Sequence, residues 1–245
     1  MRSAIVPLTF LALLLLSGGA RAQNADLLLV LAADVSRSID DGEFELQRKG
    51  YAAALSDPRV LAAIRGGPNG VIAVCFVEWS GAGEQMVVAD WTVIHDEEDA
   101  GGLAAAILAA PRSFIGRTSI SGAIDFAMAR FAAATQHSNR RVIDISGDGT
   151  NNSGRPVTEA RDQALAEGVT INGLAIINDK PNPGYAFHTQ PPGGLPHYYE
   201  ENVIGGPGAF LLQVENFDTF AEAITRKLVT EIAGVSGRQQ TASAR

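Results

Sequence analysis

The sequence predicts a doubly wound α/β domain, in which a mainly parallel six-stranded sheet with one antiparallel edge strand carries helices on both faces. Strand-like apolar segments alternate with helix-like segments along most of the 245 residues, which is typical of a parallel sheet covered on both sides. Two successive strand-like segments are joined by a short glycine-containing turn, which predicts the antiparallel edge. Because 46% of the residues are hydrophobic and the charge is moderate, we expect one large globular domain.

Hydrophobic spacing and punctuating residues define the individual elements. Phe44, Tyr51 and Leu55 recur at helical spacing, and Pro111 and Pro156 mark the end of one helix and the start of another. The predicted strands cover about residues 27–33, 70–79, 86–94, 141–146, 169–177 and 209–214. The predicted helices cover about residues 41–56, 97–110, 119–134, 156–167 and 216–233. The turn Ser80-Gly81-Ala82-Gly83 makes the second and third strands hairpin partners, and polar interruptions place the third at the edge.

The N-terminus reads as a secretory signal peptide. Arg2 precedes an apolar core at about residues 10–16, and the small-residue triplet Ala20-Arg21-Ala22 predicts cleavage before Gln23. A retained membrane anchor is the alternative, but the apolar stretch is short for a bilayer span. We therefore expect a signal at 1–22, a domain at 23–234, a flexible tail at 235–245, and a periplasmic or secreted protein without a membrane span.

Charge and cysteine content exclude some functions. Removing residues 1–22 takes away Arg2 and Arg21 and no acidic residue, so the formal net charge changes from −8 to −10. Nucleic-acid binding needs clustered Lys and Arg, and the sequence has no such cluster. Cys75 is the only cysteine, so an internal disulfide is impossible and this residue is expected to lie in the core.

Oxygen-bearing side chains follow two of the predicted strands. The apolar first strand stops at Asp34, and Ser36 and Ser38 alternate along the loop that follows, so that all three side chains can face one ion. Asp148 follows the strand at 141–146. Because parallel strands end at the same edge of a sheet, Asp34 and Asp148 are expected to share the edge where α/β folds bind ligands. Oxygen ligands suit a hard cation such as Mg²⁺.

This pattern resembles the metal-ion-dependent adhesion site of von Willebrand factor A domains. The resemblance covers Asp34-x-Ser36-x-Ser38, Thr118 before a helix, Asp148 after a later strand, and the order of elements over about residues 26–233. It implies that the three hydroxyls ligate Mg²⁺ or Mn²⁺, that the aspartates hold the ion directly or through water, and that an acidic residue of a protein partner fills an open coordination position. The motifs around Cys75–Ser80 and Ser146–Asn152 are most similar to a poorly characterised group of bacterial exported A-domain-like proteins.

Each part of the pattern has a structural alternative. The Asp-Ser-Ser triplet and Thr118 could cap helices, and Asp148 between two glycines could form a turn. Their joint occurrence in order on one edge favours the metal site. Behind these ligands, Glu78 either faces the site or is accommodated structurally, which we favour. Asn151 and Asn152 either orient metal-bound water or Asp148, or are ordinary turn formers.

The long segment from Asn178 to Gly208 leaves the same edge of the sheet and could contact a partner. Its aromatic residues Tyr185, Phe187, Tyr198 and Tyr199 are the partner-binding candidates, because aromatic residues are enriched at interfaces. The alternative is a packed surface excursion with a short helix near 197–204. His188 and His197 are not spaced as a helical zinc pair, so zinc is not expected.

The function expected from the resemblance is capture of an acidic group of a protein ligand through a bound Mg²⁺ or Mn²⁺. A Mg²⁺-dependent phosphatase is one alternative, because Gly147–Asn152 also resembles a motif of haloacid-dehalogenase-type enzymes. That chemistry needs an acid where Ser36 stands and a suitably placed lysine. A structural envelope domain without a metal-dependent partner is the other alternative. Nucleophile-elbow, phosphate-loop and zinc-protease motifs are absent from the sequence, so we do not expect an enzyme.

Overall fold

The computed structural model describes residues 24–177, 186–215 and 219–234. The predicted signal peptide, the predicted C-terminal tail and Tyr185 lie outside these residues, so they stay predictions. None of the described helices combines the length and the apolar character that crossing a membrane requires.

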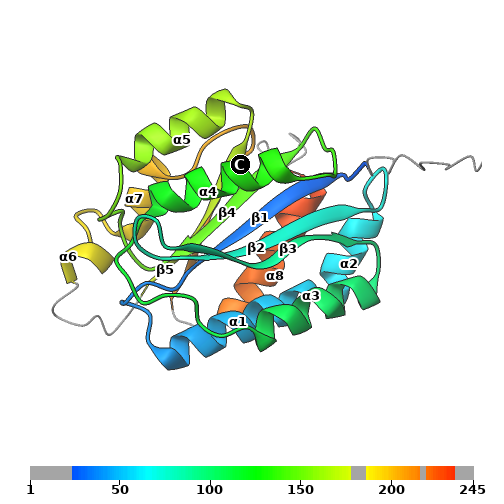
Figure 1. Cartoon of the computed structure of the whole chain (residues 1–245), viewed down its shortest axis with the longest axis horizontal. Coiled ribbons are helices and arrows are strands. Elements are labelled where there is room, and N and C mark those ends of the chain that lie inside the picture. Colours follow the sequence, from blue (N-terminus) through cyan, green and yellow to red (C-terminus); the bar gives the residue numbers. More distant parts are fainter. Residues whose placement is uncertain (1–23, 178–185, 216–218, 235–245) are drawn as a thin grey trace, which may run out of the picture.

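The sheet has six strands in the order β3-β2-β1-β4-β5-β6. Figure 1 labels the first five strands of this order. All neighbouring pairs are parallel except β2 and β3, which form the predicted antiparallel hairpin at one edge. The strands are β1 Leu27–Asp34, β2 Ile72–Trp79, β3 Gln85–Ile94, β4 Arg141–Gly147, β5 Thr170–Ile176 and β6 Leu211–Val214. The predicted fold class is confirmed.

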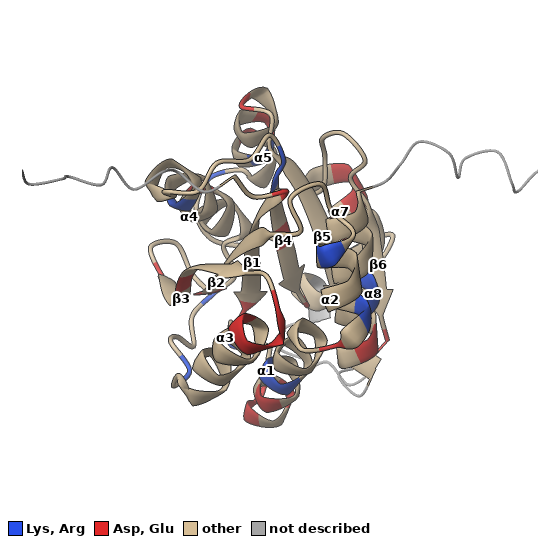
Figure 2. Ribbon diagram, turned by 90° about the vertical axis from the view of Figure 1, so that its right-hand side faces the viewer, with Lys and Arg blue, Asp and Glu red and all other residues tan. Residues whose placement is uncertain are grey.

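Helices cover both faces of the sheet (Figure 1). One face carries α1 Asp41–Leu55, α2 Pro58–Arg65, α3 Glu97–Ala109 and α8 Phe220–Ala233. The other carries α4 Ile120–Ala133, α5 Val157–Ala166 and α7 Leu195–Asn202, and the short α6 Ala186–Thr189 lies near the end of β5. Lys and Arg positions are distributed over several elements, among them α4 and α8 (Figure 2).

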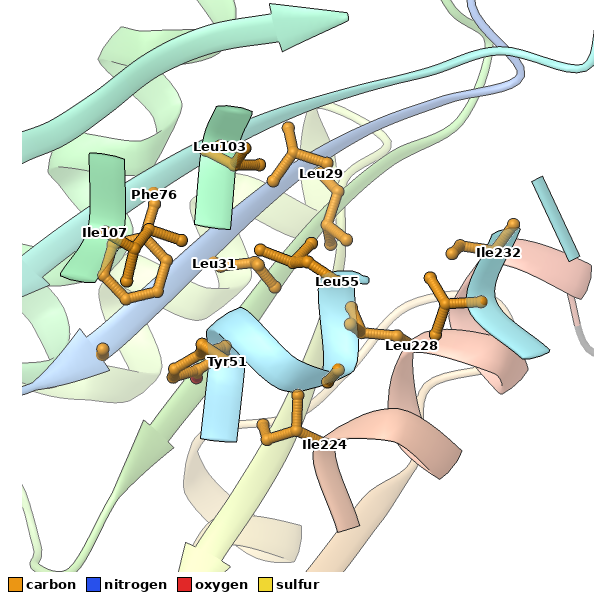
Figure 3. Packing of buried hydrophobic residues seen from close by; sticks show 14 of the residues in the cluster. Leu29, Leu31, Tyr51, Leu55, Phe76, Leu103, Ile107, Ile224, Leu228 and Ile232 are labelled. Carbon is orange, nitrogen blue, oxygen red and sulfur yellow. The ribbon is translucent and has the colours of Figure 1, made fainter. Parts of the chain in front are cut away.

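The buried strand β1 contributes side chains to two hydrophobic cores, because successive side chains of a strand point to opposite faces of the sheet. Leu29 and Leu31 pack with α1, α3 and α8, whereas Leu28 and Val30 pack on the face of α4 and α5. Figure 3 shows the first core, in which the Tyr51 ring lies edge-on to Phe76 with the centroids 4.9 Å apart. Burial on both faces explains why β1 is a continuous apolar run rather than an alternating one.

The structure differs from the prediction after the first helix. α1 ends at Leu55, and Asp57-Pro58 then begins a helix that was not predicted, α2: Asp57 caps it by accepting from the Arg59 N–H, and Pro58 occupies the first turn. A proline at this position costs nothing because the first N–H groups of a helix have no partner within it. The Asp-Pro pair therefore joins two helices.

Candidate metal centre

The carboxyl ends of β1 and β4 lie side by side at the centre of the sheet. β1 pairs with β4 on one side and with β2 on the other, so the chain order reverses between β1 and β4. Asp34 is the last residue of β1, and Asp148 follows the last residue of β4. Open α/β sheets bind ligands at such a reversal, and the two aspartates meet there as predicted.

Hydroxyl and carboxylate oxygens form a continuous cluster at this point. Ser38 Oγ donates to Asp148 Oδ1 at 2.6 Å and lies 3.2 Å from Ser36 Oγ. Thr118 Oγ1 lies 3.1 Å from Ser36 Oγ, although 82 residues separate them in the chain. The Ser36 N–H donates to Asp34 Oδ1 at 2.7 Å. The structure thus brings together all five residues of the sequence motif.

The spacing of these oxygens fits a six-coordinate cation. Ligands about 2.1 Å from Mg²⁺ and at right angles to each other are about 3.0 Å apart, close to the Ser36–Ser38 and Ser36–Thr118 separations. Within the described residues, His, Cys, Asp and Glu side chains nowhere gather in a group of three that would hold a metal by themselves. A cation here would therefore need the serine and threonine hydroxyls as well as the carboxylates.

The two carboxylates are buried without full compensation. Asp34 and Asp148 are both 0% exposed, and Oδ2 of each has no hydrogen-bond partner. Burial, with a smaller contribution from Asp148, raises the pKa of Asp34 well above its usual value, and burial raises the pKa of Asp148 to about 6. Unpartnered buried carboxylate oxygens are costly, and a divalent cation would remove that cost. The donor set and these orphaned oxygens fit Mg²⁺ or Mn²⁺.

Arg112 holds the loop that carries the two serines. Its Nη2 donates to the main-chain carbonyls of Val35, Ser36 and Ile39 at 2.9, 3.0 and 2.8 Å. This role is not predictable from the sequence, because an arginine that binds carbonyls more than 70 residues away leaves no local pattern.

The two asparagines after Asp148 connect its loop to the Thr118 loop. Asn152 Oδ1 accepts from the Thr118 N–H at 3.0 Å, and its own N–H donates to the Thr118 carbonyl at 2.9 Å. Asn151 Oδ1 accepts from the Ser121 N–H at the start of α4. These contacts favour a supporting role behind Thr118 over that of simple turn formers.

His188, on α6, covers Thr118. Its Nε2 lies 2.9 Å from Thr118 Oγ1 and its Nδ1 lies 3.0 Å from Thr150 Oγ1. Burial lowers the pKa of His188 to about 4. A side chain at Gly149 would overlap the imidazole, so the ring would have to move if this residue were larger. The contact of His188 with Thr118 was not predicted; in the sequence, only the glycines on either side of Asp148 indicate that a side chain packs closely there.

The aromatic partner-binding candidates have different environments. Tyr199 is 0% exposed, so it offers no surface to a partner; burial and the nearby Asp34 raise its pKa well above the usual value. Tyr198 is half-buried, and its hydroxyl accepts from the Asn151 N–H at 3.1 Å. Phe187 belongs to α6, but its side chain is not among the described ones. Among the candidates whose side chains the structure describes, Tyr198 is partly accessible and Tyr199 is not.

Glu78 forms a buried ion pair. Its partner is Arg48 at 2.5 Å, and Glu78 also accepts from the Ser113 N–H at 3.0 Å. Arg48 also donates to the carbonyls of Ile107, Ala110 and Pro111. The pair joins β2 and α1 to the last turn of α3 and the segment that follows it.

Solved structures with the same fold come from adhesive and matrix proteins. Proximal thread matrix protein 1 from the mussel byssus is 16% identical with a TM-score of 0.60, over 86% of this chain and 48% of that one. Another of its structures, 14% identical with a TM-score of 0.58 over 86% and 49%, is described as having a zinc-occupied metal-ion-dependent adhesion site. The pilus adhesin SpaC from Lactobacillus rhamnosus GG is 12% identical with a TM-score of 0.61, over 86% and 31%.

A von Willebrand factor type A structure from Catenulispora acidiphila is 14% identical with a TM-score of 0.57, over 86% of this chain and 43% of that one. This chain therefore spans about half or less of the length of these proteins, and at such identities the similarity shows the fold alone. No curated protein sequence matches the chain. A family model described as "Protein of unknown function (DUF1194)" matches residues 24–236, so the chain belongs to that family and has a von Willebrand factor A-like fold.

Proposed function

We propose that this protein is a periplasmic or secreted binding module that captures an acidic group of a protein ligand through a bound Mg²⁺ or Mn²⁺. The observation that carries the proposal is the cluster of three hydroxyls and two buried, incompletely compensated carboxylates at the sheet reversal. Ser36, Ser38 and Thr118 would ligate the cation, and Asp34 and Asp148 would balance its charge directly or through water. The cation supplies a Lewis-acidic position that a carboxylate can fill.

The mouth of the cluster suits an anionic ligand. A cavity of about 310 Å³ is lined by Ser38, Thr118 and His188 together with Arg37 and Arg117. Both arginines are exposed, so they would attract an approaching carboxylate in a chain whose overall charge is negative. The description of SpaC as a pilus adhesin, and of one mussel thread matrix protein structure as having an occupied metal-ion-dependent adhesion site, is consistent with this use of the fold.

The phosphatase alternative gains no support from the described lysines. Lys49 is exposed and paired with Glu45, and Lys227 of α8 is buried against Asp144 of β4 and Glu231. Ser36 supplies a hydroxyl where leaving-group protonation would need an acid. These positions favour binding over phosphoryl transfer.

Cation titration calorimetry tests the metal claim. We expect the wild-type protein to bind Mg²⁺ or Mn²⁺ and Asp34→Ala to lose most of that affinity while staying folded. Asp162→Asn is the matched control, because it removes an exposed carboxylate on α5. Equal affinity of Asp34→Ala and wild type would refute the metal site.

Ligand capture needs a separate test with defined probes. Immobilised cation-loaded protein should retain acidic peptides but not their amide counterparts, and chelator should release them. Phosphoester hydrolysis that depends on Mg²⁺ and disappears in Asp34→Asn would favour the phosphatase alternative instead. Cation binding without retention of any acidic probe would favour a structural role.

A further inference from the structure

The imidazole of His188 is fixed at the edge of the hydroxyl cluster. Its two ring nitrogens contact Thr118 Oγ1 and Thr150 Oγ1 at 2.9 and 3.0 Å. Its carbonyl accepts from the Thr150 N–H at 3.1 Å, so the backbone of α6 is tied to the loop after Asp148 as well. Gly149 leaves room for the ring. The two ring contacts and the main-chain hydrogen bond together hold His188 in place.

The position of this ring matters because a threonine hydroxyl has only one proton. When Thr118 Oγ1 directs a lone pair at a cation, its proton must point to some other acceptor. Two candidates lie within reach: Ser36 Oγ at 3.1 Å and His188 Nε2 at 2.9 Å. Ser36 would itself be directing lone pairs at the cation, so it is a poor acceptor in the loaded site. Ser38 has no such difficulty, since it donates to Asp148 at 2.6 Å.

We infer that His188 is a positioning residue for the cation: its Nε2 accepts the Thr118 hydroxyl proton, so that the Thr118 oxygen is free to ligate. The inference rests on the proposed function, which supplies the cation. The contact at the other nitrogen is consistent with this role, because a ring that accepts at Nε2 carries its proton on Nδ1 and can donate it to Thr150 Oγ1. His188 thus orients a hydroxyl ligand through a hydrogen bond, as residues that contact metal ligands generally do.

Calorimetric titration with Mg²⁺ and Mn²⁺ tests the inference on three variants. His188→Ala should weaken cation binding by about tenfold or more, the range found when such supporting partners are removed. His188→Gln should recover much of that loss, because its amide oxygen can accept the same proton. His197→Ala is the matched control, since His197 is an exposed histidine on α7, and it should bind as wild type does. All variants should unfold at similar temperatures in chelator.

A second measurement separates positioning from direct ligation and from general loss of structure. In a Thr118→Val background, His188→Ala should cost little further affinity, because the hydroxyl through which it acts is gone. Pulsed electron paramagnetic resonance of the Mn²⁺-loaded wild type should show no directly coordinated nitrogen. Strong coupling to a histidine nitrogen would overturn the inference, as would His188→Ala affinity within twofold of wild type or no recovery in His188→Gln.

Cation binding by the wild type distinguishes failure of the proposed function from failure of the inference about His188. If it binds neither cation, the proposed function fails and the role of His188 fails with it. If it binds a cation in a manner that requires Asp34 but not His188, only the inference fails.

Discussion

Arg112 shows how a single side chain can determine the shape of a binding loop. Three carbonyls of the loop between β1 and α1 accept from one guanidinium nitrogen, and of these the Ser36 carbonyl also accepts from the Ile39 N–H. Carbonyls that lose a donor in a partly buried place cost free energy, so without Arg112 the loop is expected to move. The geometry of Ser36 and Ser38 therefore depends on a residue that makes no contact with the candidate cation position in this structure.

We predict that Arg112→Met lowers the free energy of unfolding by about 1–3 kcal/mol and weakens cation binding. Arg112→Lys should restore little, because an ammonium group lacks the planar fork that reaches several carbonyls. Urea denaturation and calorimetry measure the two effects, with Arg130→Met as the control, since Arg130 pairs with the exposed Asp90. Cation affinity equal to wild type in Arg112→Met would show that the loop keeps its shape alone.

Elements on the α1 face are joined by buried charges as well as by apolar packing. Arg48 of α1 and Glu78 of β2 form one buried pair, and Lys227 of α8 contacts Asp144 of β4 and Glu231 in another group. A buried pair contributes little net stability compared with apolar residues, but removing one partner leaves an uncompensated charge. We therefore expect these charges to matter through the cost of removing one partner more than through net stabilisation.

For the first pair, we predict that Arg48→Met and Glu78→Leu each lower the free energy of unfolding by about 3–5 kcal/mol. The double variant should be clearly less destabilised than the sum of the two, because neither charge is then left alone. Urea denaturation of the four proteins gives the coupling energy. Additive losses would mean that the contacts of Arg48 with the carbonyls after α3, rather than the ion pair, dominate.

The group around Lys227 predicts a pH dependence. Burial, followed by the charge of Glu231, raises the pKa of Asp144 to about 7, from 3.8 in an unfolded chain. Between these values the folded protein holds a proton that the unfolded chain releases, so Asp144 makes the free energy of unfolding fall as pH rises from about 4 to 7. Above pH 7 this contribution is constant. The decline should be smaller in Asp144→Asn, measured by urea denaturation across that range, and an equal decline in both proteins would contradict the assignment.

At the scale of the whole molecule, the sequence predicts those features that depend on local pattern. The alternation of elements and the Gly-containing turn at Ser80–Gly83 correctly gave the sheet and its antiparallel edge. The motif residues converged because Asp34 and Asp148 end neighbouring parallel strands. Tyr199 could not be separated from Tyr198 in this way, since only the rotation of α7, about 100° per residue, decides which of two adjacent tyrosines is buried. Arg112 and His188 act through folded-state contacts that leave no spacing in the sequence.

The cluster as a whole predicts that the carboxylates needed for cation binding lower the stability of the cation-free protein. In chelator, Asp34 and Asp148 are two buried carboxylates with orphaned oxygens, so Asp34→Asn should be at least as stable as the wild type. With cation present, binding to the folded state adds to stability according to its concentration, by about 2.7 kcal/mol at 100 times the dissociation constant. The wild type should then become the more stable protein, because Asp34→Asn binds the cation weakly. Thermal unfolding in chelator and in excess Mg²⁺ measures this reversal of order. Asp162→Asn should follow the wild type in both conditions, and an unchanged order of wild type and Asp34→Asn would show that relief of buried charge is not what the cation contributes.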